Sequence, residues 1–194
     1  MSGYQSIRNS IQVPIRRDYF FAMIIKSVNG KTPNIPKDCY IAENATIVGD
    51  VTLGDSCSIW FNAVIRGDVN SITIGNKVNI QDGAVIHCTY QKHATTIGSN
   101  VSIGHNAIVH GCTIEDNVLI GMGAIVMDNC TIKSNSIIAA GAVVTQNTIV
   151  PSGTIYAGIP AKWVKDIDAS DFAGEIERIS NNYVMYSGWF KDEN

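Results

Sequence analysis

The chain has 194 residues, of which 45% are hydrophobic and 16% charged, with a formal net charge of −3. This length and composition suffice to bury a real core and argue against intrinsic disorder. The slight acidity excludes a typical nucleic-acid partner, and no apolar run approaches the roughly 20 residues of a membrane span. The five cysteines form no C-x-x-C pair, which favours a reducing compartment, and we expect a cytoplasmic protein.

The first part of the chain does not join the pattern that follows. Residues 1–22 carry Arg8, Arg16 and Arg17, and Pro14 interrupts any helix there. The run from Asn29 to Pro33 is typical of a turn. We therefore assign residues 1–29 to an N-terminal extension.

An aliphatic residue then recurs at every sixth position, with slips near residues 68–72 and 88–96. A period of six fits neither a helix nor a long alternating strand, and a β-sandwich would not explain it. Three hexads close one triangular coil of about 18 residues, and successive coils stack about 4.8 Å apart. The sequence thus predicts an all-β fold, a hexapeptide-repeat parallel β-helix over residues 30–164. The repeated positions are Ile41, Ile47, Leu53, Ile59, Ile65, Ile74, Ile80, Ile86, Ile97, Ile103, Ile114, Ile120, Val126, Ile132, Ile138, Val144 and Val150.

The repeats fade after Val150, and residues 165–194 are predicted to form a C-terminal helix and tail. The run from Tyr156 to Lys162 contains Pro160 and is interpreted as an exit loop. A helix is expected to begin near Asp171, and its apolar stripe should pack along the coils. The stripe comprises Phe172, Ile176, Ile179, Tyr183 and Tyr186, followed by Trp189 and Phe190 as packing or interface residues.

Three of the four histidines indicate a metal site. His87 and His105 are 18 residues apart, the length of one predicted coil, so we expect them to stack. His110 follows five residues later and is expected near the same corner, whereas His93 falls in a slipped segment. A lone histidine is more often structural, but three imidazoles with an open fourth position suit catalytic Zn²⁺. Fe²⁺ and Co²⁺ suit the same ligands.

These histidines stand in an ordered series of motifs that resembles the γ-class carbonic anhydrase family, over about residues 31–162. The resemblance implies a left-handed β-helix and a homotrimer with metal at the subunit interfaces. His87 and His110 would come from one subunit and His105 from its neighbour. The motifs are Arg66-Gly67-Asp68, Asn79-Ile80-Gln81-Asp82-Gly83, Ile86-His87, Gly104-His105, His110-Gly111-Cys112-Thr113-Ile114 and Gly121-Met122-Gly123-Ala124.

The same resemblance implies the reversible hydration of carbon dioxide to bicarbonate by zinc-activated water. Gln81 matches a residue that orients the hydroxide or the substrate. Arg66, Asp68 and Asp82 match residues that form ion pairs. A direct catalytic role and a purely architectural role are equal alternatives for them. Tyr156 matches a tyrosine that lines the site.

Two departures from the family pattern predict slow or buffer-dependent hydration. Val69 stands where fast members carry an acidic residue, and the segment from Cys88 to Thr96 is short and lacks a carboxylate. Two other functions remain open. One is acyl transfer or thioester hydrolysis on a coenzyme A substrate with one histidine as general base, and the other is a non-catalytic subunit of an assembly.

Overall fold

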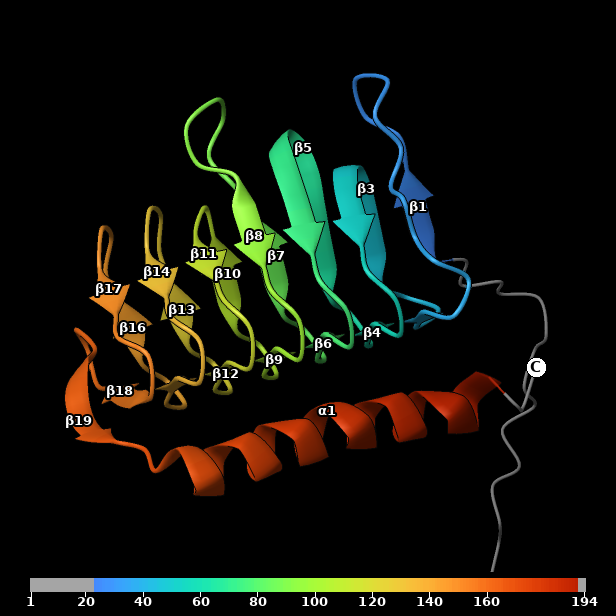
Figure 1. Ribbon diagram of the computed structural model, residues 1–194. Coiled ribbons are helices and arrows are strands. Elements are labelled where there is room, and N and C mark those ends of the chain that lie inside the picture. The colour runs from blue at the N-terminus through green and yellow to red at the C-terminus, as the bar shows by residue number, and fades with distance from the viewer. Residues whose placement is uncertain (1–22, 192–194) are drawn as a thin grey trace, which may run out of the picture.

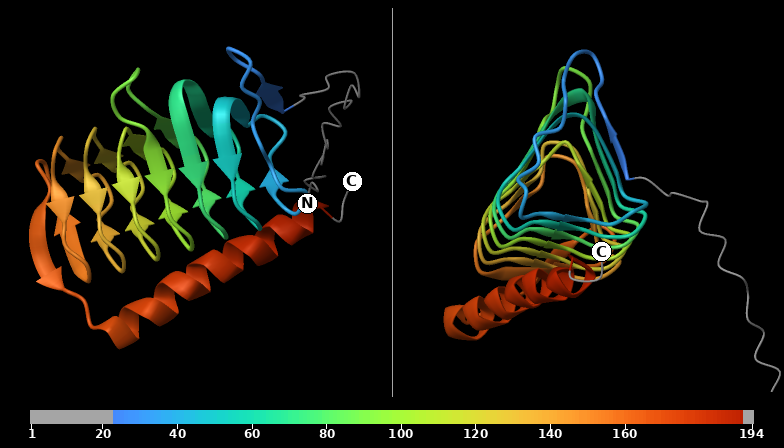
Figure 2. Two further views of the ribbon diagram at one scale, coloured as in Figure 1. Left: turned by 45° about the horizontal axis from the view of Figure 1, so that its top comes forward. Right: turned by 90° about the vertical axis from the view of Figure 1, so that its right-hand side faces the viewer.

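The computed structural model describes residues 23–191, so residues 192–194 and the first 22 residues of the predicted extension lie outside it. The chain winds into stacked triangular coils, and α1 (Ala169–Lys191) lies along one side of the stack (Figures 1 and 2). This confirms the predicted all-β fold of hexapeptide repeats with a C-terminal helix packed alongside.

Two sides of the prism form one 11-stranded sheet, and the third side forms an 8-stranded sheet. The long strand β5 bends round a corner, because it pairs with β7 at one end and with β8 at the other. The first sheet contains β1 (Ile24–Lys26), β3 (Thr46–Leu53), β5 (Val64–Ile74), β7 (Val85–His87), β8 (Thr95–Ile97), β10 (Ile108–His110), β11 (Thr113–Ile114), β13 (Ile125–Val126), β14 (Thr131–Ile132), β16 (Val143–Val144) and β17 (Ile149–Val150). The second contains β2 (Tyr40–Ile41), β4 (Ser58–Ile59), β6 (Asn79–Ile80), β9 (Ser102–Ile103), β12 (Leu119–Ile120), β15 (Ile137–Ile138), β18 (Thr154–Ala157) and β19 (Lys162–Asp166).

The hexad aliphatic residues form columns inside the prism. In the 8-stranded sheet, strands β4, β6, β9, β12 and β15 pair in parallel and in register. Each contributes one fully buried isoleucine to the same column, and burial of such columns holds repeat folds together. These residues are Ile59, Ile80, Ile103, Ile120 and Ile138.

Truncating one column residue should destabilise the whole stack. Ile103 is 0% exposed, and we expect Ile103→Ala to lower the free energy of unfolding by about 2–5 kcal/mol. Ile149 is 65% exposed, so the same change there should cost less than about 0.5 kcal/mol. Chemical denaturation followed by circular dichroism measures both. Equal losses at the two positions would contradict the buried column.

The corners of the coils use residues that tolerate the left-handed backbone region. Asn62 and Asn106 have φ values of 59° and 56°, and Gly83, at the same corner of the intervening coil, has φ of 70°. Asparagine and glycine adopt this conformation at the least cost. The turn at Asn106 directly follows His105, so the corner geometry fixes where that histidine leaves the stack.

Helix α1 packs against the 8-stranded sheet through an apolar stripe. Ile176 is buried, and the ring of Tyr183 meets Trp60 edge-on at 5.5 Å between centroids. Phe190 packs against Tyr40 and Trp60 at 5.5 and 5.6 Å. The predicted stripe and packing role are confirmed for these residues, whereas the side chain of Phe172 lies outside the description. No helix in the described range has the length and apolar character needed to cross a bilayer.

Both ends of the stack differ from the sequence-based expectation. The chain after Val150 does not simply exit: β18 and β19 pair antiparallel. Pro160 lies in the turn between them, where its missing N–H is not required. At the other end β1 pairs in parallel with β3, so the sheet begins at Ile24, before residue 30.

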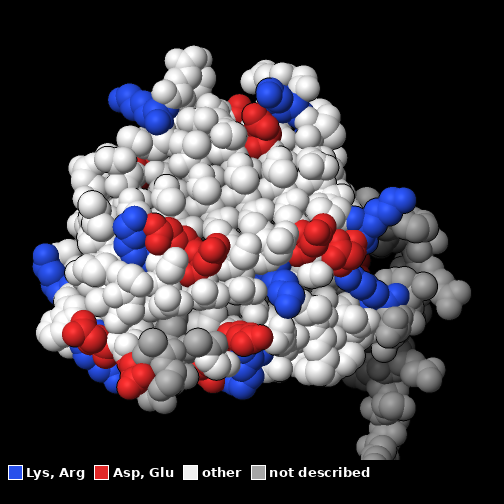
Figure 3. Space-filling model, viewed as in Figure 1, with Lys and Arg blue, Asp and Glu red and all other residues white. Residues whose placement is uncertain are grey.

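The five cysteines are unpaired, and four of them are buried, namely Cys57, Cys88, Cys112 and Cys130. Burial raises the pKa of Cys112 and Cys130, which keeps both thiols protonated at neutral pH. They therefore pack as small hydrophobic side chains, as predicted. On the face shown in Figure 3, Lys and Arg side chains lie beside Asp and Glu rather than in a basic stripe.

Candidate metal site

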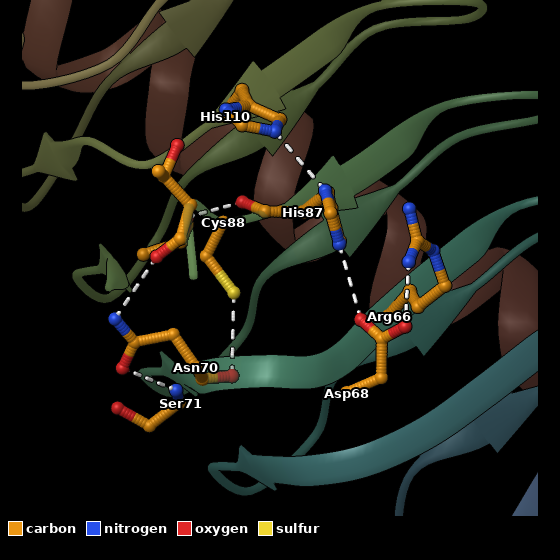
Figure 4. Close-up of polar contacts among 9 residues, drawn as sticks. Arg66, Asp68, Asn70, Ser71, His87, Cys88 and His110 are labelled. Carbon is orange, nitrogen blue, oxygen red and sulfur yellow. Dashed lines mark hydrogen bonds and ion pairs between the residues drawn. The ribbon is translucent and has the colours of Figure 1, made fainter. Parts of the chain in front are cut away.

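Two of the predicted ligands, His87 and His110, lie side by side at the ends of β7 and β10. These strands pair in parallel with His110 in register with His87. Nδ1 of His87 lies 3.0 Å from Nε2 of His110. Both rings lie on the same side of the prism, and Figure 4 shows them next to each other.

The prediction that His87 stacks with His105 was wrong. The loop between β7 and β8, closed by a bridge between Thr89 and His93, lengthens this coil. The paired histidines are therefore 23 residues apart rather than 18. The loop protrudes beyond the neighbouring coils just before β8 (Figure 1). His105 instead lies on the turn between β9 and β10, where Asp82 is its neighbour in the preceding coil.

A carboxylate and a guanidinium hold the far edge of the His87 ring. Nε2 of His87 lies 3.1 Å from Oδ1 of Asp68, whose Oδ2 accepts a hydrogen bond from Arg66 at 2.6 Å (Figure 4). Burial alone would raise the pKa of Asp68, but the hydrogen bonds from Arg66 and His87 outweigh it and lower the pKa. Burial, together with the positive charge of Arg66, lowers the pKa of His87. The pair is thus an ionised carboxylate against a neutral imidazole.

His110 has a matching carboxylate that the sequence analysis missed. Nδ1 of His110 lies 3.1 Å from Oδ1 of Asp128, and the Thr89 hydroxyl donates to the same oxygen at 2.6 Å. Burial raises the pKa of Asp128, but these two hydrogen bonds more than compensate and lower it. A signal was available, because Asp128 follows His110 by 18 residues, one standard coil.

If both imidazoles are neutral, their hydrogen bonds to the carboxylates leave two lone pairs facing each other. An ionised carboxylate can only accept hydrogen bonds, so Nε2 of His87 and Nδ1 of His110 must each carry a hydrogen. In neutral imidazoles the opposite nitrogens then carry none, and these are the two atoms 3.0 Å apart. Two Zn–N bonds of about 2.0–2.1 Å at a tetrahedral angle place their nitrogens about 3.3 Å apart. A divalent metal therefore fits the pair in chemistry and in spacing.

Three further predicted residues, Gln81, Asp82 and His105, form a second group at the other end of the same side. Nδ1 of His105 lies 2.9 Å from Oδ2 of Asp82. Gln81 is 7% exposed, and its Nε2 donates to Oδ1 of Asn79 at 2.9 Å, so its carbonyl oxygen is left to accept. Gln81 and His105 open onto a cavity of about 390 Å³ beneath α1.

The described part of one chain does not bring three predicted ligands together. Among the described residues, no three His, Cys, Asp or Glu side chains lie close enough together to hold a metal ion. Tyr156 lies on β18, three strands along its sheet from β9. At one strand spacing each this is about 14 Å, so Tyr156 is remote from His105 within a chain, and its role stays a prediction.

Comparisons with known proteins show the family to which the chain belongs. The family model for bacterial transferase hexapeptide (six repeats) matches residues 32–67 and 111–146. A Methanocaldococcus jannaschii protein named "Probable carbonic anhydrase" is 54% identical over 78% of this chain and 92% of that protein. The Arabidopsis thaliana protein named "Gamma carbonic anhydrase 2, mitochondrial" is 37% identical over 88% of this chain, which spans 63% of its length. The crystal structure of a hexapeptide transferase family protein from Anaplasma phagocytophilum superposes with a TM-score of 0.81 at 38% identity, covering 86% of this chain and 98% of that one. The chain belongs to the γ-class carbonic anhydrase-like family of hexapeptide-repeat proteins.

Proposed function

We propose that the protein catalyses the metal-dependent, reversible hydration of carbon dioxide to bicarbonate as a homotrimer. The observation that carries this proposal is the 3.0 Å approach of Nδ1 of His87 to Nε2 of His110, with a carboxylate beside the opposite nitrogen of each ring. Zn²⁺ is the first expectation for such nitrogen ligands, with Fe²⁺ and Co²⁺ as alternatives. Metal analysis of the purified protein, paired with a hydration assay, tests it.

The division of the site into two groups supports a cyclic assembly, for which we propose three subunits. His87 and His110 stand at one end of a prism side, and His105 with Gln81 and Asp82 stands at the other. A cyclic arrangement with contacts between unlike edges would bring the second group of one subunit to the first group of the next. Each interface would then hold one metal with three imidazole ligands.

The residues of the chain have distinct roles in this scheme. A divalent metal lowers the pKa of water and so supplies a nucleophile at neutral pH. Arg66 holds Asp68, which orients His87. Asp82 orients His105 in the same way, which leaves its Nε2 free to bind. The carbonyl of Gln81, fixed by Asn79, accepts a hydrogen bond from the reacting water.

We expect hydration to be slow and to depend on buffer. Each turnover releases a proton that must reach solvent. Neither the short loop after His87 nor position 69, which is Val69, offers a carboxylate to carry it. Stopped-flow hydration in increasing concentrations of an imidazole buffer should show the rate rise by about tenfold or more and then saturate. A fast rate that stays constant from the lowest buffer concentration would contradict this prediction.

Acyl transfer from a coenzyme A thioester is the main alternative, because the Anaplasma protein of the same fold is named a transferase. One histidine would then act as general base without metal. Acyl transfer that survives complete removal of metal would favour this alternative. A non-catalytic assembly subunit would instead lose its oligomeric state when the metal is removed. No catalysed reaction would be abolished.

A further inference from the structure

Asp128 lies on the turn between β13 and β14 and is 18 residues beyond His110, one coil further along the stack. Its Oδ1 lies 3.1 Å from Nδ1 of His110 and 2.6 Å from the donating hydroxyl of Thr89. Its side chain is 22% exposed, so water competes only weakly for these contacts.

The surroundings confine this carboxylate. Gly111, directly after His110, has φ of 53°, and a Cβ there would collide with Oδ1 of Asp128. The backbone N–H of Gly111 donates to the Thr95 hydroxyl at 3.0 Å, and that hydroxyl donates to the carbonyl of His87 at 2.6 Å. Thr95 begins the strand to which the loop returns, so this end of the loop is tied to residues at the ends of both histidine strands.

We infer that Asp128, clamped by Thr89, is a positioning residue that holds His110 with its hydrogen on Nδ1 and its lone pair on Nε2, directed at the metal. This inference rests on the proposed function. Accepting from Nδ1–H fixes both the tautomer and the ring orientation, which are what a carboxylate behind a metal-binding imidazole controls. Asp68 stands in the same relation to His87 and Asp82 to His105.

The inference also gives the loop between β7 and β8 a role. The loop lacks an acidic side chain, but it closes through a hydrogen bond from the backbone N–H of Thr89 to the carbonyl of His93 and presents the Thr89 hydroxyl to Asp128. It acts as a clamp on the His110 side of the site. A change in the loop that removes only this hydroxyl should therefore weaken metal binding.

Metal affinity provides the first test. Zn²⁺ affinity, measured by competition with a chromogenic chelator, should fall about 10- to 100-fold in Asp128→Ala. Thr89→Val should weaken binding by a smaller factor, and Thr89→Ser, which keeps the hydroxyl, should restore it. Asp116→Ala is the matched control, because Asp116 accepts from the backbone N–H of Ser99 at 2.7 Å and its described hydrogen bonds include no histidine. Wild-type affinity in both Asp128→Ala and Thr89→Val would overturn the inference.

The tautomer of His110 provides the second test and does not need metal. Long-range ¹H–¹⁵N spectra of the metal-free protein, assigned with a His110→Gln variant, should show hydrogen on Nδ1 in the wild type and a shift toward Nε2 in Asp128→Ala. If the wild type bound no metal but the tautomer shifted, the proposed function would fail and the positioning of His110 by Asp128 would stand. An unchanged tautomer would overturn the positioning role, whatever the metal content.

Discussion

Replacing His110 with alanine should empty the metal site and abolish carbon dioxide hydration. His110 lies beside a second proposed ligand, His87, and next to the carboxylate of Asp128, both in the same chain. Its loss leaves two imidazoles, too few for a site that needs three protein ligands. We expect the metal content to fall from about one ion per chain to less than about a tenth, as measured by inductively coupled plasma mass spectrometry.

His93→Ala is the matched control for this substitution. His93 lies in the loop bridged to Thr89, and it was predicted to be a loop residue rather than a ligand. The variant should keep its metal and its hydration rate. The His110→Ala protein should retain the circular dichroism spectrum of the β-helix, because His110 lies outside the buried columns. Full metal retention in His110→Ala would contradict the ligand assignment.

The periodicity of the sequence predicted the coils well because each hexad repeats one physical requirement. An inward aliphatic residue at every sixth position places Ile120 next to Ile138, three hexads later, where the structure has them. The irregular segments were harder to predict. The number of residues in the coil that contains the loop between β7 and β8 could not be known before the ends of that loop were located. That uncertainty placed His87 opposite His105, whereas the pairing strands bring it opposite His110.

The residue types of the site could be predicted from the sequence, but the side chains that contact each of them could not. The histidines were identified as candidates, yet Asp128 carried no motif of its own, and its distance of 18 residues from His110 became meaningful through the register of β13 with β10. Gln81 and Asp82 were identified, but their separation from His87 along one side of the prism depends on the corner at Gly83. The antiparallel return of β19 was also missed, because Pro160 ends a coil without forbidding a hairpin.

Complementation between defective subunits tests the central claim, that two chains build each metal site. His105→Ala and His110→Ala chains carry different affinity tags, are co-expressed, and mixed oligomers are isolated through both tags. In a cyclic trimer each mixed assembly contains a single interface with all three histidines, so it should hold about one metal ion, against about three in the wild type. Each variant alone should hold almost none. Mixed trimers without metal, or His105→Ala trimers with a full complement, would contradict the shared site.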